Sequence, residues 1–413
     1  MKKFTHLFFL FSFTFSLHAT NTFQEKFSAA VRHAQQHEFE RALEIQKELV
    51  ATHPNNPSVL YNTAHILLRM GRMQEALPFY EKTIALRPEN GQAHLGYAKT
   101  CLATGNFTTG WQAFEHRMAD YNTYKQQFQF HHLTPKNIFG KTVLVRSEWG
   151  LGDMMQFIRY TKLLKKCGAK KIIVSAFSPL VDLFSLCDSI DEVVSTKSEI
   201  VPAHDVQIPT LSLPLFFNTQ VDTIPCTIPY LHADPKLVTF WQKKLQAVEQ
   251  NKKPFRVGLC WQAKPDIFLE KNPLTRRSIP LKLFAPLADV TGVKFYSLQR
   301  QFGEEQLADL PDGFVVHDFG PDFDTTHGRF MDTAAVIQNL DLIISVDTAI
   351  VHLAGGLGAK VLVLLPSVAE WRWHLEKNTT PWYPNVLLFR QKKQGQWREV
   401  IQEIKKHLIQ TCG

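Results

Sequence analysis

Short apolar runs alternate with helix-like segments along the C-terminal part of the chain, most clearly around residues 340–366. Leu342–Val346 and Val361–Leu365 are apolar runs of the length and composition typical of strands buried on both faces. Between them, helix-starting Asp347 and Thr348 precede apolar residues at helical spacing, and Gly358 ends the segment. The pattern predicts a strand–helix–strand unit with parallel strands. Its helix should begin with free amides that form an anion site, and phosphate is the first ligand to suspect.

The same alternation extends over the preceding residues. Strands are expected at 143–145, 171–174, 193–194 and 206–208, and in a second set at 255–261 and 294–298. Helices are expected at 154–166, 236–250, from a capping Asp332 to Asn339, and at 399–409. This order predicts two Rossmann-like lobes, 136–235 and 254–413, with a ligand cleft at the carboxyl ends of both sheets.

Residues 23–124 carry a different pattern, an internal repeat of 34 residues. Equivalent positions are Ala30, Ala64 and Ala98; Phe39, Met73 and Phe107; Ala42, Ala76 and Gly110; and Pro54, Pro88 and Asn122. Small residues fall where two helices touch, bulky ones fill the layer between them, and proline ends the second helix. This pattern resembles three copies of the tetratricopeptide repeat, of which the third departs most. Such arrays bind peptide or protein in a concave groove, but an array that only braces its neighbour is an equal alternative.

Composition narrows the picture only slightly. The 413 residues carry a net charge of +8 that is spread along the chain, so no nucleic-acid partner is expected. Six cysteines are scattered without a C-x-x-C pair, which argues against a zinc or disulfide framework.

The N-terminus resembles a secretory signal. Lys2 and Lys3 precede an apolar run at 7–17, and residues 16–19 offer a cleavage site, so 1–19 is treated as a signal-peptide-like segment. The run is too short to span a membrane comfortably. A tail that stays uncut is the alternative, and localisation remains open between export or membrane association and the cytoplasm.

The first candidate site is the turn Gly150-Leu151-Gly152-Asp153 between an expected strand and helix. Its glycines allow close approach of backbone to a ligand. It is not the dinucleotide fingerprint, because Met155 stands where the third glycine belongs. Asp153 has two interpretations: a helix cap, which the local sequence favours, or a general base facing the cleft.

Several further motifs follow in a fixed order. They are G-L-G-D-M-M-Q-F-I-R-Y, V-G-L-C-W-Q, R-R-S-I-P-L, Y-S-L-Q, D-T-A-A-V-I-Q-N-L-D-L-I-I-S-V-D-T-A-I-V-H-L-A-G-G-L-G, E-W-R-W and P-W-Y-P-N-V-L-L-F-R-Q. Together, from about Gly140 to the C-terminus, they resemble the catalytic half of bacterial tetratricopeptide-repeat glycosyltransferases, relatives of the ADP-heptose:lipopolysaccharide heptosyltransferase family. The repeats in front match as well.

The resemblance implies a fold class: an α/β GT-B domain behind an all-α tetratricopeptide-repeat domain. It implies an inverting glycosyltransferase that takes a nucleotide-sugar donor and needs no obligatory metal or other cofactor. Asp153 matches the proposed base, and Arg277 is the nearest match to the cation that stabilises the leaving diphosphate. The expected donor- or phosphate-binding residues are Gly150, Gly152, Gln299, Asp347, Thr348, Ala349 and His352.

Simple chemistry is consistent with these roles, but each residue has a structural alternative. Helix amides, a histidine and a guanidinium can hold the charge that develops on a leaving diphosphate. His352 is equally well explained as a packed imidazole, and Asp347 more naturally organises its turn than touches an anion. The Trp371–Trp373 segment lines an acceptor face or, more commonly for such tryptophans, the core.

The predicted function is transfer of a sugar from a nucleotide-sugar donor to a protein or glycan acceptor that the repeats select. Glu370 and the loops 264–275 and 317–329 depart from the family pattern, which leaves the donor unidentified. The signal-like N-terminus conflicts with the cytoplasmic supply of nucleotide sugars. Two rivals remain: a non-catalytic repeat scaffold with a degenerate GT-B domain, and a nucleotide-sugar epimerase of the same fold.

Overall fold

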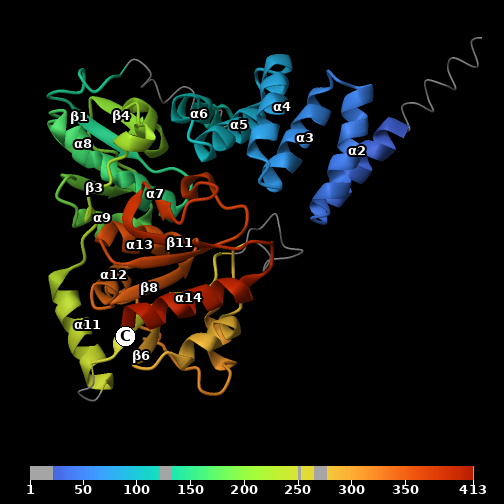
Figure 1. Ribbon diagram of the computed structural model, residues 1–413. Helices are drawn as coiled ribbons and strands as arrows, with labels where there is room; N and C mark the ends of the chain where they lie inside the picture. The colour runs from blue at the N-terminus through green and yellow to red at the C-terminus, as the bar shows by residue number, and fades with distance from the viewer. Residues whose placement is uncertain (1–21, 121–132, 250–252, 265–276, 413) are drawn as a thin grey trace, which may run out of the picture. The chain divides into compact units, whose positions relative to one another are not determined.

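The computed structural model describes residues 22–120, 133–249, 253–264 and 277–412 (Figure 1). The signal-like segment 1–19 and most of the loop 264–275 therefore lie outside the described residues. The chain forms two compact units, one up to Lys125 and one from Gln126 onward. Each unit is described by itself below.

The first unit consists of repeated pairs of helices, as the period of 34 residues predicts. Its helices are 22–35, α2 (Phe39–Thr52), α3 (Pro57–Arg69), α4 (Met73–Leu86), α5 (Gly91–Ala103), α6 (Phe107–Phe114) and the 3₁₀ helix η1 (Glu115–Asp120). Asn56 and Asn90, also 34 residues apart, cap α3 and α5 with their side-chain oxygens. Pro54 and Pro88 follow the ends of α2 and α4 by two residues. The helical-repeat prediction is confirmed within the described residues.

The repeated small residues lie where the helices touch. Ala30, Ala64 and Ala98, and likewise Ala42 and Ala76, are completely buried. Gly110 takes the place of alanine in the third copy because a Cβ there would lie 2.7 Å from the side chain of Leu102. The departure at Gly110 therefore has a packing cause, whereas Asn122 lies outside the described residues.

The second unit begins with a four-stranded parallel sheet of order β3-β2-β1-β4, the core of the first lobe. Its strands are β1 (Thr142–Arg146), β2 (Lys171–Ala176), β3 (Glu192–Ser195) and β4 (Val206–Pro209). They match the four expected strands. The single helix expected at 154–166 is instead three short segments: α7 (Leu151–Phe157), η2 (Ile158–Tyr160) and α8 (Thr161–Lys166). The smaller elements η3 (Ser178–Leu180), α9 (Val181–Ser185), η4 (Thr210–Ser212) and α10 (Leu213–Phe216) complete this lobe.

The chain then crosses to the second lobe. Beyond η5 (Val221–Thr223), the amides of Tyr230 and Leu231 both donate to the carbonyl of Gly356, and α11 (Pro235–Val248) follows a capping Asp234. A side chain at Gly356 would collide with Leu231 and Tyr230. The connecting segment is thereby docked on the second lobe before α11 begins.

The second lobe holds a seven-stranded sheet of order β10-β11-β9-β8-β5-β6-β7, parallel except for the β10–β11 pair. Its strands are β5 (Phe255–Cys260), β6 (Val293–Ser297), β7 (Val316–His317), β8 (Leu342–Val346), β9 (Val361–Leu365), β10 (Thr379–Thr380) and β11 (Tyr383–Arg390). Its helices are η7 (Leu281–Asp289), η8 (Glu304–Ala308), α12 (Met331–Ile337), α13 (Ala349–Leu357), η9 (Trp371–Trp373) and α14 (Trp397–Cys412). The predicted unit β8–α13–β9 is confirmed, with its two strands parallel.

One hydrophobic core lies on a face of this sheet. Alternate residues of β8, such as Leu342, Ile344 and Val346, pack with apolar residues of η7 and α14. Helix α13 contacts β8, β9 and β11 and lies beside α12. Because α13 leaves the carboxyl end of β8, its first residues lie at the edge of the sheet where ligands of such folds bind.

The expectation that Asp332 caps its helix is wrong. Helix α12 begins at Met331 after Phe330, whose φ of 66° places it in the left-handed region. Asp332 lies inside the first turn, where Oδ1 accepts from Trp241 Nε1 at 2.7 Å and Oδ2 from the Asp324 amide at 2.9 Å. Its buried carboxylate ties α11 and the 324 turn to α12 rather than ending a helix.

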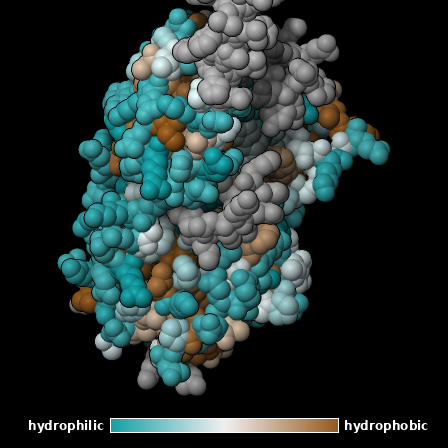
Figure 2. All heavy atoms as spheres, turned by 90° about the vertical axis from the view of Figure 1, so that its right-hand side faces the viewer, coloured by the Kyte–Doolittle hydropathy of each residue, from teal (hydrophilic) through white to brown (hydrophobic). Residues whose placement is uncertain are grey.

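One face of the molecule in spheres is mostly hydrophilic, with scattered hydrophobic patches (Figure 2). None of the helices in the described ranges combines the length and the apolar character that crossing a bilayer requires.

Replacing Gly96 with alanine should destabilise the repeat unit. A Cβ at this position would lie 2.5 Å from the ring of Tyr80, a fully buried side chain. Overpacking of this kind costs about 1–3 kcal/mol. Hydrogen exchange should show faster opening of α4 and α5, whereas Lys82→Ala on the exposed side of α4 should leave their exchange unchanged. Equal protection in wild type and Gly96→Ala would contradict this packing.

Candidate functional site

The two lobes meet where the start of α7 touches the start of α13. Gly152, in the first turn of α7, has no side chain, and a Cβ there would lie 2.8 Å from His352 Cδ2 and 3.4 Å from Ala349 Cα. The glycine expected to contact a donor thus makes room for a helix of the other lobe. The N-termini of two helices, each with a favourable field for anions, are brought together by this contact.

The start of α13 lacks a side-chain cap. Thr348 is the N-cap residue, but its hydroxyl is directed to Ser345 Oγ at 3.2 Å and Cys260 Sγ at 3.6 Å. The helices α3, α5, α6 and α11 are capped by an asparagine or aspartate oxygen, whereas α2 and α4, like α13, have no side-chain cap. Thr348 and Ala349 are only half-buried. The first amides of α13 are therefore not used by a side-chain cap, and the binding of an anion there stays a prediction.

Asp153 is both a cap and a residue of the lobe boundary. Its Oδ2 accepts a hydrogen bond from the Gly150 amide at 3.2 Å, which closes the first turn of α7. Its Oδ1 accepts from Arg372 Nη2 of the second lobe at 2.6 Å. The two interpretations of Asp153 are therefore compatible: one oxygen stabilises its own helix and the other faces across the boundary.

Arg372 lies in η9, in the Trp371–Trp373 segment that follows β9. It is buried, its Cζ lies 5.2 Å from the ring centre of Trp371, and its Nε has no hydrogen-bond partner among the described residues. The next residue, Trp373, stacks on His352 with ring centroids 5.6 Å apart. The tryptophans of this segment therefore belong to the hydrophobic core, and its arginine belongs to the candidate site.

His352 is a buried, neutral imidazole. Its Nδ1 shares a hydrogen bond of 2.8 Å with the Tyr383 hydroxyl. Burial, together with the charges of Arg372, Arg159 and Arg277, lowers the pKa of His352 well below 6.5. The packed interpretation describes this geometry, and a contact between His352 and phosphate stays a prediction.

Asp347 and Arg277 form the other wall of the α13 start. Arg277 is exposed and its Nη1 donates to the Asp347 carbonyl at 3.1 Å. Burial raises the pKa of the Asp347 carboxyl, while the nearby charges of Arg277 and Arg372 oppose that shift. The Asp347 backbone carbonyl holds Arg277, which brings a cation to the uncapped amides, and a role of the carboxyl in organising this turn stays a prediction. Its neighbour Arg276 lies outside the described residues.

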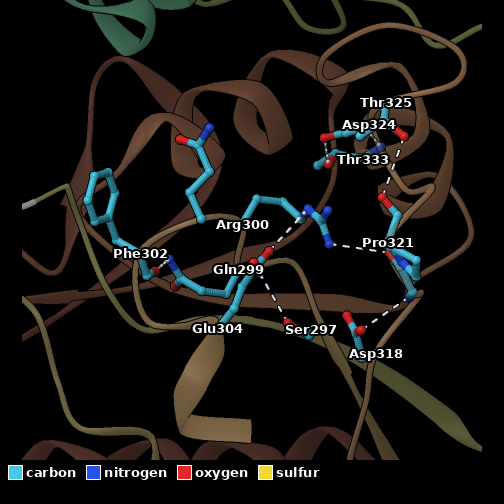
Figure 3. A network of polar contacts seen from close by, with 12 residues as sticks. Ser297, Gln299, Arg300, Phe302, Glu304, Asp318, Pro321, Asp324, Thr325 and Thr333 are labelled. Carbon is cyan, nitrogen blue, oxygen red and sulfur yellow. Dashed lines mark hydrogen bonds and ion pairs between the residues drawn. The ribbon is translucent and has the colours of Figure 1, made fainter.

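The Gln299 side chain is held mainly by backbone groups, and Figure 3 shows it beside Phe302, whose carbonyl accepts from Gln299 Nε2. Its Oε1 accepts from the amides of Trp261 at 3.0 Å and Gln262 at 2.9 Å, while its Nε2 donates to the carbonyls of Gln262 and Phe302. The amide group therefore joins the loops that follow β5 and β6. A direct bond from Gln299 to a nucleotide, like donor contacts of Gly150, stays a prediction.

Sequence reasoning missed a second arginine that joins the lobes. Arg159 of η2 is buried, donates to the Trp382 carbonyl and to the Tyr230 hydroxyl, and lies 4.5 Å from the ring centre of Tyr383. The only sequence signal for Arg159 was its place in the motif G-L-G-D-M-M-Q-F-I-R-Y. Its partners lie 71 and 223 residues away, so no local pattern identifies them.

Comparisons with known proteins agree with this organisation. A tetratricopeptide-repeat profile matches residues 67–109. Protein FlbA of Caulobacter vibrioides is 24% identical over 366 residues, which cover 83% of this chain and 60% of that protein. The chain thus spans only part of the length of this curated relative.

Two solved structures resemble the second unit. A glycosyl transferase family 9 protein from Veillonella parvula has a TM-score of 0.47 at 12% identity, over 65% of this chain and 90% of that one. The ADP-heptose lipopolysaccharide heptosyltransferase II of E. coli has a TM-score of 0.46 at 14% identity, over 65% and 99%. By its own repeats and its two parallel sheets, the chain is a tetratricopeptide-repeat protein with a GT-B-type pair of lobes.

Acidification should reveal the neutral state of His352. Its folded pKa lies well below 6.5, so below pH 6.5 the unfolded chain binds more protons at this residue and stability falls with pH. The loss reaches about 1.4 kcal/mol per pH unit. The free energy of unfolding of wild type minus that of His352→Gln should be constant above about pH 7.5 and decrease as the pH falls from about 6.5 to 5. A constant difference would show that His352 titrates normally in the folded protein.

Proposed function

We propose that this protein is a glycosyltransferase that moves a sugar from a nucleotide-sugar donor to an acceptor hydroxyl with inversion. The single observation that supports it is the uncapped start of α13, which lies beside Arg277 and opposite Asp153 across the lobe boundary. This arrangement combines an anion site and a carboxylate in the place where two-lobed folds bind ligands.

The diphosphate of the donor binds at the start of α13. The amides of Ala349 and Ile350 point out of the helix end, and the Arg277 guanidinium supplies a full positive charge beside them. Both stabilise the negative charge that grows on the leaving nucleoside diphosphate in the transition state. The Asp347 backbone carbonyl accepts a hydrogen bond from Arg277 and keeps the guanidinium at this place.

The reaction is a single displacement. The acceptor oxygen forms a bond to the anomeric carbon of the sugar while the bond from that carbon to the phosphate oxygen breaks. The electron pair of the broken bond leaves with the nucleoside diphosphate, and Asp153 takes the proton of the acceptor hydroxyl. Attack from the face opposite the leaving group inverts the configuration.

Gly152, His352 and Gln299 support this site by positioning. Gly152 permits the contact between α7 and α13, neutral His352 fills it, and Gln299 fixes the loops after β5 and β6. The helical repeats present or select the acceptor, a protein or a glycan, in keeping with the usual role of such arrays.

A non-catalytic scaffold is the second candidate function, and one observation favours it. Both oxygens of Asp153 already accept hydrogen bonds, from Gly150 and from Arg372. An oxygen that already accepts a hydrogen bond cannot accept the proton of a hydroxyl until its partner leaves. A scaffold needs no such release.

Nucleotide binding and donor turnover separate the two candidates. Isothermal calorimetry of the full chain with ADP, GDP, UDP and CDP should detect binding of at least one of them, whose sugar conjugates are then tested for transfer or hydrolysis. Asp153→Asn should reduce turnover about 10²–10⁴-fold, the usual contribution of a general base. The exposed Asp188→Asn in the same lobe should be neutral. Absence of binding would favour the scaffold, and equal turnover of Asp153→Asn would remove its role as base.

Removal of divalent cations should leave turnover nearly unchanged. The charge on the leaving diphosphate is assigned to Arg277 and to helix amides, which do not depend on a bound ion. With EDTA in place of MgCl₂, kcat should stay within about twofold, while Arg277→Gln should lower kcat by about tenfold or more. Loss of activity in EDTA that Mg²⁺ restores would contradict this assignment.

A further inference from the structure

The ion pair between Asp153 and Arg372 has a feature that a purely structural pair would not need. It joins the two lobes at 2.6 Å, with only 16% and 10% of the two side chains exposed. Arg372 also keeps an unused donor, because its buried Nε has no hydrogen-bond partner among the described residues. A guanidinium with one partner and one free buried donor can bind a further anion.

The surroundings of Arg372 place that anion at the start of α13. Its partner Asp153 follows Gly152, which packs against Ala349 and His352 in the first turn of that helix. The following residue, Trp373, stacks on the His352 ring. Arg372 is therefore a neighbour of the uncapped amides as well as of Asp153.

The other buried arginine of the lobe boundary behaves differently. Arg159 donates to the carbonyls of Trp382 and Pro225 and to the Tyr230 hydroxyl, and its Nε donates to the Gln156 carbonyl. Its donors are used by fixed neutral oxygens, so it has a structural role. Arg372 instead donates to the Asp153 carboxylate, which the reaction needs for another purpose, while the charges of Glu370 and Asp347 also stabilise its guanidinium.

We propose that Arg372 is a positioning residue that exchanges partners: it holds Asp153 while no donor is bound and moves to the donor's diphosphate when the donor arrives. The exchange releases Asp153 Oδ1, the oxygen that takes the proton from the acceptor. The inference rests on the proposed function and adds an order of events to it: the donor diphosphate binds first, and the base becomes free only after that. No covalent bond changes in this step, and the guanidinium stays charged throughout.

The exchange predicts a competition that a structural ion pair does not. Asp153 and the diphosphate compete for one guanidinium, so removal of the carboxylate should strengthen diphosphate binding. Removal of the guanidinium should weaken it. A hydrogen bond to a charged group contributes about 1.5–3 kcal/mol, so each change in affinity should be about tenfold or more.

Calorimetry on the full chain tests this directly. Wild type, Asp153→Asn, Arg372→Gln and the double variant are titrated with ADP, GDP, UDP, CDP and inorganic pyrophosphate. For each diphosphate that wild type binds, Asp153→Asn should bind about tenfold more tightly and Arg372→Gln about tenfold more weakly, and the double variant should match Arg372→Gln. Glu249→Gln is the matched control, because its partly buried pair with Arg256 at 2.7 Å belongs to the same lobe but not to this site.

The outcomes separate this inference from the proposed function. If wild type binds none of the diphosphates, the proposed function fails and the partner exchange with it. If wild type binds but Asp153→Asn binds equally or more weakly, the exchange is wrong and the transferase proposal stands. Should Arg372→Gln fail to fold, Arg372→Lys takes its place, alone and combined with Asp153→Asn. Tighter binding by Asp153→Asn that persists in full when Arg372 is replaced would be the plain loss of a repelling charge and would overturn the exchange.

Discussion

The close contact between α7 and α13 is the constraint on which the rest of the site depends. It requires glycine at 152, because a Cβ there would meet His352 at 2.8 Å. Burial and the charges of the surrounding arginines lower the pKa of the His352 imidazole that fills this contact. Two helix starts from different lobes are thereby fixed within contact distance. The carboxylate of Asp153 and the free amides of α13 owe their common location to this one packing arrangement.

The positive charges at the lobe boundary divide into fixed and exchangeable groups. Arg159 is satisfied by protein oxygens and aromatic faces, so it joins the lobes whether or not a ligand is present. Arg277 is exposed beside the α13 start, and Arg372 is paired with a carboxylate but keeps a donor unused. A site with one exposed arginine and one arginine that keeps an unused donor suits a ligand with several negative charges. A nucleoside diphosphate meets that requirement.

Local sequence patterns correctly predicted those elements whose conformation depends on residues close by in the sequence. The β8–α13–β9 unit follows from apolar runs and helix signals within one stretch, and the repeats follow from a fixed period. Asp332 carries the same cap signal, yet it is a buried anchor because it bonds to Trp241, 91 residues away. The Asp153–Arg372 pair spans 219 residues, and the role of Gly152 depends on a helix from the other lobe. Strand β11 was present only as a motif, since its pairing with β9 decides its conformation.

Hydrogen exchange with and without a bound nucleoside diphosphate tests the central claim most directly. The claim is that the start of α13 holds the diphosphate while α7 lies opposite. Saturation with whichever of ADP, GDP, UDP or CDP binds should slow amide exchange at 348–352 and alter it at 150–154, with β1 and the repeat helices unchanged. Slower exchange elsewhere, with 348–352 unaffected at saturation, would contradict the account.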